Sequence, residues 1–104
     1  MAQATGIIEV FGLAAAFVAL DAGCKAANVT AEHFDKNKPG NADALPVPLI
    51  VCIKFRGSVS DVKAAVEAAE EAANRVSGVV SKHVIANVEE STEKMLKLNA
   101  FDKN

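Results

Sequence analysis

The run LIVCIKFRG, residues 49–57, most constrains the fold, because a strongly amphipathic helical pattern follows it directly. A run of β-branched and aromatic residues that ends at a glycine is typical of a strand. Ser58 can cap the helix that follows, with Asp61 three residues on, and Gly78 can end it. The apolar face expected for this helix is formed by Val62, Ala65, Val66, Ala69, Ala72, Ala73 and Val76.

The N-terminal segment repeats this strand-then-helix pattern. TGIIEVFG, residues 5–12, is an aliphatic run that predicts a strand and ends at a glycine. LAAAFVALDAGCKAAN, residues 13–28, predicts a helix that stops near Asn28. We expect its packing residues to be those that recur at helical spacings of four, three and four, namely Leu13, Phe17, Leu20 and Cys24.

Three shorter patterns follow in the chain. VTAEHF, residues 29–34, predicts a short polar strand, and VVSKHVIA, residues 79–86, alternates as a strand does. Asn87 with Glu90 can open a short last helix. The apolar contacts expected for that helix are Met95 and Leu96.

These elements, in the order βαββαβα, predict one α+β domain over residues 1–104. We expect a small, mainly antiparallel sheet with the helices covering one face, and a frayed tail over residues 97–104. Between the second and third strands runs DKNKPGNADALPVP, residues 35–48, which shows neither helical nor alternating periodicity. A loop this long in a small domain is usually functional or disordered.

The composition limits what the domain can do alone. Hydrophobic residues make up 51% of the 104 residues, but only 5% are aromatic, and much of the rest is alanine and valine. Because alanine buries little area, the core of a single subunit is thin, and subunit contacts are expected to add stability. The net charge of −2 gives no footprint for nucleic acid. The apolar run GLAAAFVAL, residues 12–20, is too short to span a membrane.

Several segments together resemble the BMC-domain shell proteins of bacterial microcompartments. FRGSVSDVKAAVEAA, residues 55–69, and RVSGVVSKHVIA, residues 75–86, match the order and spacing of that family's later segments, and the resemblance covers residues 5–96. The first strand and helix, residues 6–29, resemble the family's opening. The family's N-terminal segment ends in a characteristic pattern, which is formed here by Asp21, Lys25, Ala26, Ala27 and Val29.

The resemblance implies a structural protein and a location for it. It implies cyclic homohexamers that tile edge to edge into flat sheets and enclose enzymes. The expected partners are other shell proteins and the encapsulated enzymes, and the expected location is a microcompartment shell in the cytoplasm. In this family the loop between the second and third strands usually lines the central pore of the hexamer, which assigns that role to residues 35–48.

The chain departs from the family pattern in two places. The pore loop is usually short and glycine-rich, but here Val47–Leu49 stand in its place after an insertion. The family's Pro-Arg-Pro is replaced by Ala86–Val88, so we expect weaker tiling, which partner shell proteins would support. Prolines stiffen the chain and extend the residues before them, which predicts a narrower or more apolar pore. The pore-lining candidates are Leu45, Pro46, Val47, Pro48 and Leu49.

The edge of the hexamer is expected to include Lys25, Asn28 and Asn87. The resemblance places Lys25 opposite its symmetry mate in the next hexamer. Two ammonium groups cannot pair, so each should donate to a carbonyl of the facing hexamer. The alternative function is a regulatory domain of similar build that binds a small molecule, with the long loop as a clamp.

Catalytic and metal chemistry are not expected. His33 and His83 lie far apart in the sequence without a third ligand at metal spacing, so neither is assigned a metal. Cys52 lies inside a strand and is expected to be an inert thiol in the core, and both cysteines are expected to be reduced. No general base stands beside a nucleophile. We therefore expect a protein that is not an enzyme and has no cofactor.

Overall fold

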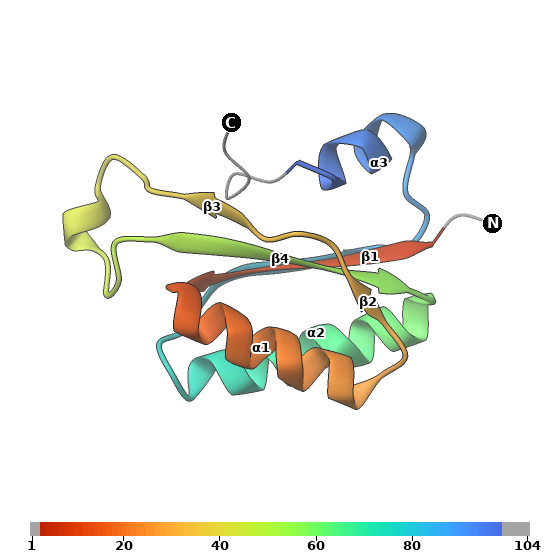
Figure 1. Ribbon diagram of the computed structural model, residues 1–104, viewed down its shortest axis with the longest axis horizontal. Helices are drawn as coiled ribbons and strands as arrows, with labels where there is room; N and C mark the ends of the chain where they lie inside the picture. The colour runs from red at the N-terminus through yellow and green to blue at the C-terminus, as the bar shows by residue number, and fades with distance from the viewer. Residues whose placement is uncertain (1–2, 99–104) are drawn as a thin grey trace.

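The computed structural model describes residues 3–98 (Figure 1). Each predicted element is present, although some bounds differ from those expected. The part after Leu98, which the sequence predicted to fray together with Lys97 and Leu98, lies outside the described residues. The elements are β1 Ala4–Phe11, α1 Leu13–Ala26, β2 Thr30–Ala31, β3 Asp35–Asn37, a 3₁₀ helix Ala42–Ala44, β4 Ile50–Gly57, α2 Val59–Asn74, β5 Val79–Ile85 and α3 Glu90–Leu96.

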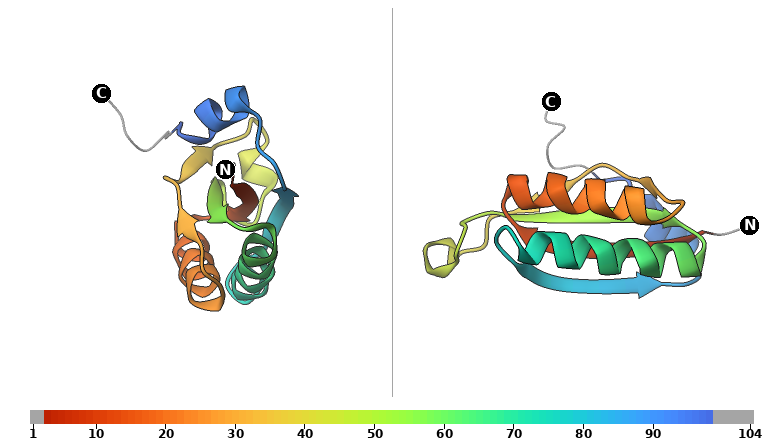
Figure 2. Two further views of the ribbon diagram at one scale, coloured as in Figure 1. Left: turned by 90° about the vertical axis from the view of Figure 1, so that its right-hand side faces the viewer. Right: turned by 90° about the horizontal axis from the view of Figure 1, so that it is seen from below.

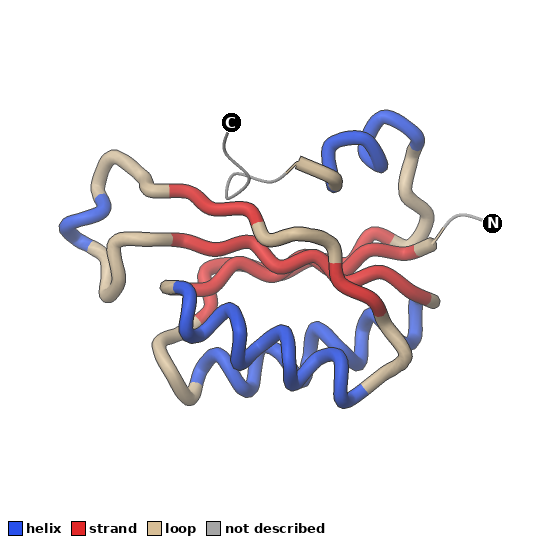
Figure 3. The backbone as a smooth tube through the Cα atoms, viewed as in Figure 1, coloured by secondary structure: helices blue, strands red, loops and turns tan. Residues whose placement is uncertain are grey.

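The sheet is built around β1 and β4, with the order β2-β4-β1-β5. Figure 3 shows its strands in red above the two long helices. β1 pairs with β4 on one side, where Ile8 lies opposite Ile53, and with β5 on the other. β2 and β3 both pair with the far edge of β4. All these pairings are antiparallel, as the sequence predicted.

Part of the long loop is structured, and this corrects the expectation of a structureless run. Asp35–Asn37 forms β3 and pairs with Ile50–Cys52 of β4. Ala42–Ala44 forms the 3₁₀ helix at the tip. The strand predicted over residues 29–34 is correspondingly short, because only Thr30 and Ala31 pair with β4 there.

The helices cover both faces of the sheet. α1 and α2 lie side by side on one face, and α3 lies on the opposite face (Figures 1 and 2). The expectation that all helices share one face is therefore wrong for α3. Lys54 and Arg56 alternate along β4 with the core residue Phe55, so they reach the face away from α1 and α2. There Lys54 Nζ donates to the carbonyl of Leu96, at 2.9 Å, which ties the end of α3 to the sheet.

The inward face of α1 also differs from the prediction. Its buried residues are Ala15, Ala16, Ala19 and Gly23, which pack against α2 and the sheet. Of the predicted stripe, Leu20 packs against the core, but Phe17 is 56% exposed, and Leu13 and Cys24 are also exposed. The inward face of α1 requires small residues, because a Cβ on Gly23 would lie only 2.7 Å from Cε1 of the buried Phe55 ring. A bulky side chain there would push the helix off the sheet.

The prediction for α2 is confirmed along the helix itself. Ser58 Oγ accepts a hydrogen bond from the Asp61 amide at 3.1 Å, which caps the N-terminus. Val76 lies beyond the helix and is 49% exposed. At α3, Glu89 rather than Asn87 is the cap, because its carboxylate accepts from the Ser91 amide at 2.8 Å. The buried residues of α2 are Val62, Ala65, Val66, Ala69, Ala72 and Ala73.

Candidate functional site

The long loop extends the molecule at one end of its long axis (Figure 1). Its tip is closed by the short 3₁₀ helix, which the Leu45 amide ends by donating to the Ala42 carbonyl at 3.1 Å. The chain then returns to the body, where the Gly12 amide donates to the Leu49 carbonyl at 2.8 Å. The loop is thus anchored at the β1–α1 junction and free at its tip.

The five pore-lining candidates have different surroundings in the subunit. Leu49 packs against the core, and Val47 lies against Gly12, where an added Cβ would come within 3.1 Å of its Cγ1. Leu45 is half-buried and extended, with φ −93° and ψ 153°, as expected for a residue before a proline. Pro46 and Pro48 are exposed. The prolines are therefore the candidates most open to a neighbouring subunit.

The edge candidates lie at the opposite end of the long axis. α1 runs away from the loop, so Lys25 and Asn28 are at the far end, and Asn87 lies in the connection between β5 and α3 at that same end (Figure 1). Lys25 Nζ pairs with Asp21 Oδ2 at 2.8 Å, and this hydrogen bond raises the pKa of the lysine. The Asn28 amide donates to Asp61 Oδ1 at 3.4 Å.

A buried cationic cluster holds α3 on the sheet, and the sequence analysis missed it. Arg56 is 5% exposed, and its guanidinium pairs with both carboxylate oxygens of Glu93, one at 2.9 Å, and approaches Glu32 at 3.6 Å. The hydrogen bond to Glu93 raises the pKa of Arg56 and lowers that of Glu93. The sequence did contain a signal for this cluster, because Lys54 and Arg56 stand at alternate positions of an otherwise apolar strand. The cluster is structural, because each group already has a partner within the fold.

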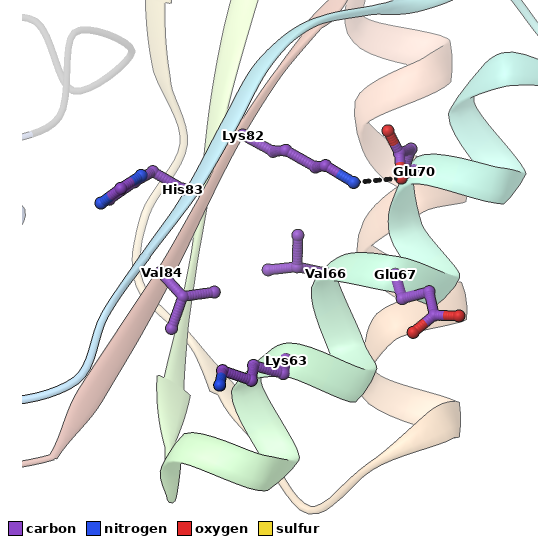
Figure 4. A pocket seen from close by; sticks show the side chains of 7 residues that line it. All are labelled: Lys63, Val66, Glu67, Glu70, Lys82, His83 and Val84. Atoms are coloured by element: carbon purple, nitrogen blue, oxygen red, sulfur yellow. Dashed lines mark hydrogen bonds and ion pairs between the residues drawn. The ribbon is translucent and has the colours of Figure 1, made fainter.

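The surface formed by residues 3–98 includes two hollows that contain titratable side chains. The larger, about 430 Å³, lies between α2 and β5 (Figure 4). Its walls carry Glu70 and Lys82, joined at 2.6 Å, while His83 points to the other side of β5 (Figure 4). The smaller, about 170 Å³, is lined partly by Cys52 and Asp35. Cys52 is half-buried and is not part of the core, so its predicted place there is wrong. Partial burial still raises the pKa of its thiol to about 11, which supports the predicted inertness.

The larger hollow is lined by Lys63, Val66, Glu67, Glu70, Lys82, His83 and Val84. In residues 3–98, no group of three His, Cys, Asp or Glu side chains is arranged to hold a metal ion. None of the helices described there is long and apolar enough to cross a membrane.

Comparison with known proteins finds relatives that are shell proteins of bacterial microcompartments. The family model of the BMC domain matches residues 4–88. The carboxysome shell protein CcmK2 of Synechocystis is 41% identical over 98 residues, which span 92% of this chain and 86% of the relative. The bacterial microcompartment shell protein PduA of Citrobacter freundii is 37% identical over 94 residues, or 90% of this chain and 91% of the relative.

A solved structure shows the same fold. A microcompartment protein from Desulfitobacterium hafniense superposes with a TM-score of 0.70 over 96% of this chain, at 22% identity. This chain spans 49% of the length of that protein. At this identity the likeness concerns the fold alone, and it confirms the predicted α+β architecture.

The fold and the relatives define a structural protein of microcompartment shells, and not an enzyme. The chain belongs to the BMC domain family. Its predicted role as a shell protein is confirmed, and so is its predicted location in a microcompartment shell. The alternative of a small-molecule-binding regulatory domain finds no support among these relatives.

Proposed function

We propose that the protein forms cyclic homohexamers that tile into the wall of a shell, with residues 35–48 bordering a central pore. The observation that carries this proposal is the separation along the long axis. The loop lies at one end, and Lys25, Asn28 and Asn87 lie at the other (Figure 1). A subunit placed radially would therefore present the loop to the six-fold axis and the three edge residues to the next hexamer.

The dimensions of the subunit agree with six copies in a ring. The molecule measures 42 × 31 × 20 Å along its principal axes. With the 42 Å axis radial and the loop near the centre, the middle of the subunit lies at half that length, about 21 Å from the six-fold axis. The circumference there is about 132 Å (2π × 21 Å), which leaves about 22 Å of arc for each of six subunits. This arc matches the short axis of the subunit, 20 Å, if that axis lies along the ring.

The pore proposed here differs from a glycine-lined one. Six copies of a loop stiffened by Pro46 and Pro48 would converge on the axis, and both prolines are exposed in the subunit. The half-buried Leu45 lies at the start of the same extended segment. These features support a pore that is narrower or more apolar than a ring of glycines, through which small metabolites would cross.

The outer edge would join hexamers. The Lys25 ammonium is exposed and held by one carboxylate, so it keeps donors for a carbonyl of a facing hexamer. Because Asn87 stands where the family often has arginine, we propose that tiling is weak and is supported by other shell proteins. The enclosed enzymes would be the further partners of the assembled wall.

Light scattering of the purified protein tests the ring directly. The expected mass is six times 10.8 kDa. A monomer at micromolar concentration would contradict the proposal. Electron microscopy of the same sample should show sheets, tubes or discrete rings, and discrete rings alone would indicate that tiling needs a partner protein.

A further inference from the structure

An apolar surface remains exposed along one lateral edge of the subunit. We call it the aromatic edge, and it consists of Leu13, Phe17 and Phe34. Phe17 is 56% exposed and Leu13 39%. The Phe17 and Phe34 rings meet edge to face, with centroids 5.1 Å apart, so α1 and the segment between β2 and β3 present one continuous surface.

The opposite lateral edge carries the hollow between α2 and β5. Val66 and Val84 form its apolar floor, and charged side chains form the rim (Figure 4). An apolar centre with a polar rim is the usual anatomy of a protein interface. β5 is also an edge strand, because its described pairing is with β1 alone, and exposed strand edges are commonly covered.

The two surfaces lie at similar distances from the loop end. α1 and α2 run in opposite directions, and Gly23 faces the Ala65 carbonyl, which lies 3.1 Å from a Cβ built on that glycine. Phe17 precedes Gly23 by six residues, or about 9 Å of helix, and moving the same distance along α2 from Ala65 leads to Glu71, beside Glu70 of the hollow. Phe17 is thus level with the inner part of the hollow.

We infer that the aromatic edge of one subunit packs into the α2–β5 hollow of the next subunit around the ring. This rests on the proposed hexamer and identifies the interface that would close it. A second copy fits because the two surfaces lie on opposite edges of one subunit, which is what a heterologous, ring-closing contact needs. The exposed 56% of Phe17 is apolar surface that the contact would bury against a hollow whose floor is apolar.

The charge on the rim also suits an aromatic guest. Glu70 and Lys82 pair with each other. Lys63 forms no ion pair among residues 3–98, so its ammonium is available to lie over the face of an inserted ring. The contact would then combine buried apolar area with a cation–π interaction at the rim.

The first test places a charge in the proposed contact. In Phe17→Asp, a carboxylate would enter the hollow, and we expect the concentration needed for assembly to rise at least about 30-fold, the effect of losing an interface hot spot. Val18→Asp is the matched control, because Val18 is 45% exposed but is not part of the aromatic edge. Mass is measured by light scattering across a dilution series, and circular dichroism checks the fold.

The results separate this inference from the proposal of a hexamer. A hexameric wild type, a dissociated Phe17→Asp and an intact Val18→Asp support the contact. If Phe17→Asp keeps the mass of the wild type, or if both variants dissociate alike, the assignment is wrong although the hexamer stands. A monomeric wild type overturns both.

The second test holds even if Phe17→Asp does not fold. Lys63→Cys places a thiol on the hollow, and the exposed native Cys24 lies on the α1 side of the opposite edge, one residue beyond Gly23. A short bismaleimide should link these two thiols between neighbours and give a ladder up to six subunits in denaturing gels. Partial desolvation of the sulfur and the nearby Asp21 carboxylate raise the pKa of Cys24, so the reaction is run at mildly alkaline pH.

The controls decide how the ladder is read. Ala64→Cys places an exposed thiol next along the helix but outside the hollow, and it should not exceed the cross-linking of the wild type. Burial raises the pKa of Cys52 to about 11, so that thiol should react little. A ladder beyond dimers in Lys63→Cys alone supports the contact. Monomers or dimers only, or an equal ladder in Ala64→Cys, would overturn it.

Discussion

Replacing Gly23 by alanine tests how closely α1 must approach the sheet. Judged by helix propensity alone, the change should stabilise the protein by about 1 kcal/mol. The surroundings predict the reverse. The new methyl group would lie 2.7 Å from Cε1 of Phe55, closer still to Cζ, and 3.1 Å from the Ala65 carbonyl oxygen. The Phe55 ring is fully buried, so it has no free space into which it can turn.

The size of the effect follows from these two opposing contributions. Normal contact between carbon atoms is about 3.5–4.0 Å, so the overlap approaches 1 Å or more. Overpacking of a dense core typically costs about 1–3 kcal/mol, and an overlap of this size belongs at the upper end. After subtraction of the gain in helix propensity, Gly23→Ala should lower the free energy of unfolding by about 2 kcal/mol.

The assay is denaturant unfolding at one fixed protein concentration, followed by circular dichroism. Gly40→Ala is the matched control, because a Cβ at Gly40 meets nothing within 4 Å. It should be neutral or stabilise by about 0.4–1 kcal/mol. In a double-mutant cycle, Phe55→Leu removes the clashing ring atoms, so Gly23→Ala should cost far less in that background. If Gly23→Ala behaves like Gly40→Ala, the close approach is not what selects glycine there.

Three further predictions concern the edge, α3 and the loop. Lys25→Ala should weaken sheet formation but leave the ring intact, since the lysine pairs only with the exposed Asp21 within the described subunit; sheets unchanged by electron microscopy would count against the edge assignment. The hydrogen bond from Arg56 lowers the pKa of Glu93. The contribution of this ion pair to stability is therefore fully present above about pH 4.5, and it is lost as the pH falls through the lowered pKa. Hydrogen exchange of α3 amides should therefore speed up there relative to β1, and Glu93→Gln should flatten this dependence. Deletion of Ala42–Pro46 should keep the mass of the ring and change its permeability to small solutes, measured in reconstituted shells; loss of the ring would place the loop in the subunit contact.

Local chemistry determined much of the fold from the sequence alone. The strand at residues 49–57 and the cap at Ser58 depend on neighbouring residues, so they could be read without tertiary information. The buried face of α2 followed from its period, because the residues from Val62 to Ala73 that became buried recur at spacings of three and four. The family also followed from the sequence, because three segments match it in order and spacing.

The tertiary structure decided which surfaces face inward. Helical periodicity shows which residues of α1 share a side, but α1 has two candidate sides, one bulky and one small. The side with small residues faces the core, because the close approach of α1 to α2 and Phe55 leaves no room for a side chain at Gly23. The bulky side, with Phe17, therefore stayed on the surface, where we place the contact between subunits.

The same holds for β3 and α3, whose positions depend on partners distant in the sequence. Asp35–Asn37 has no strand pattern of its own and becomes a strand because β4 offers unpaired backbone groups along its edge. α3 is short, and its side of the sheet is set by Lys54 and Arg56, which need acceptors once they are buried. Sequence periodicity thus determined the elements, and the requirement to fill space and pair polar groups determined where each one lies.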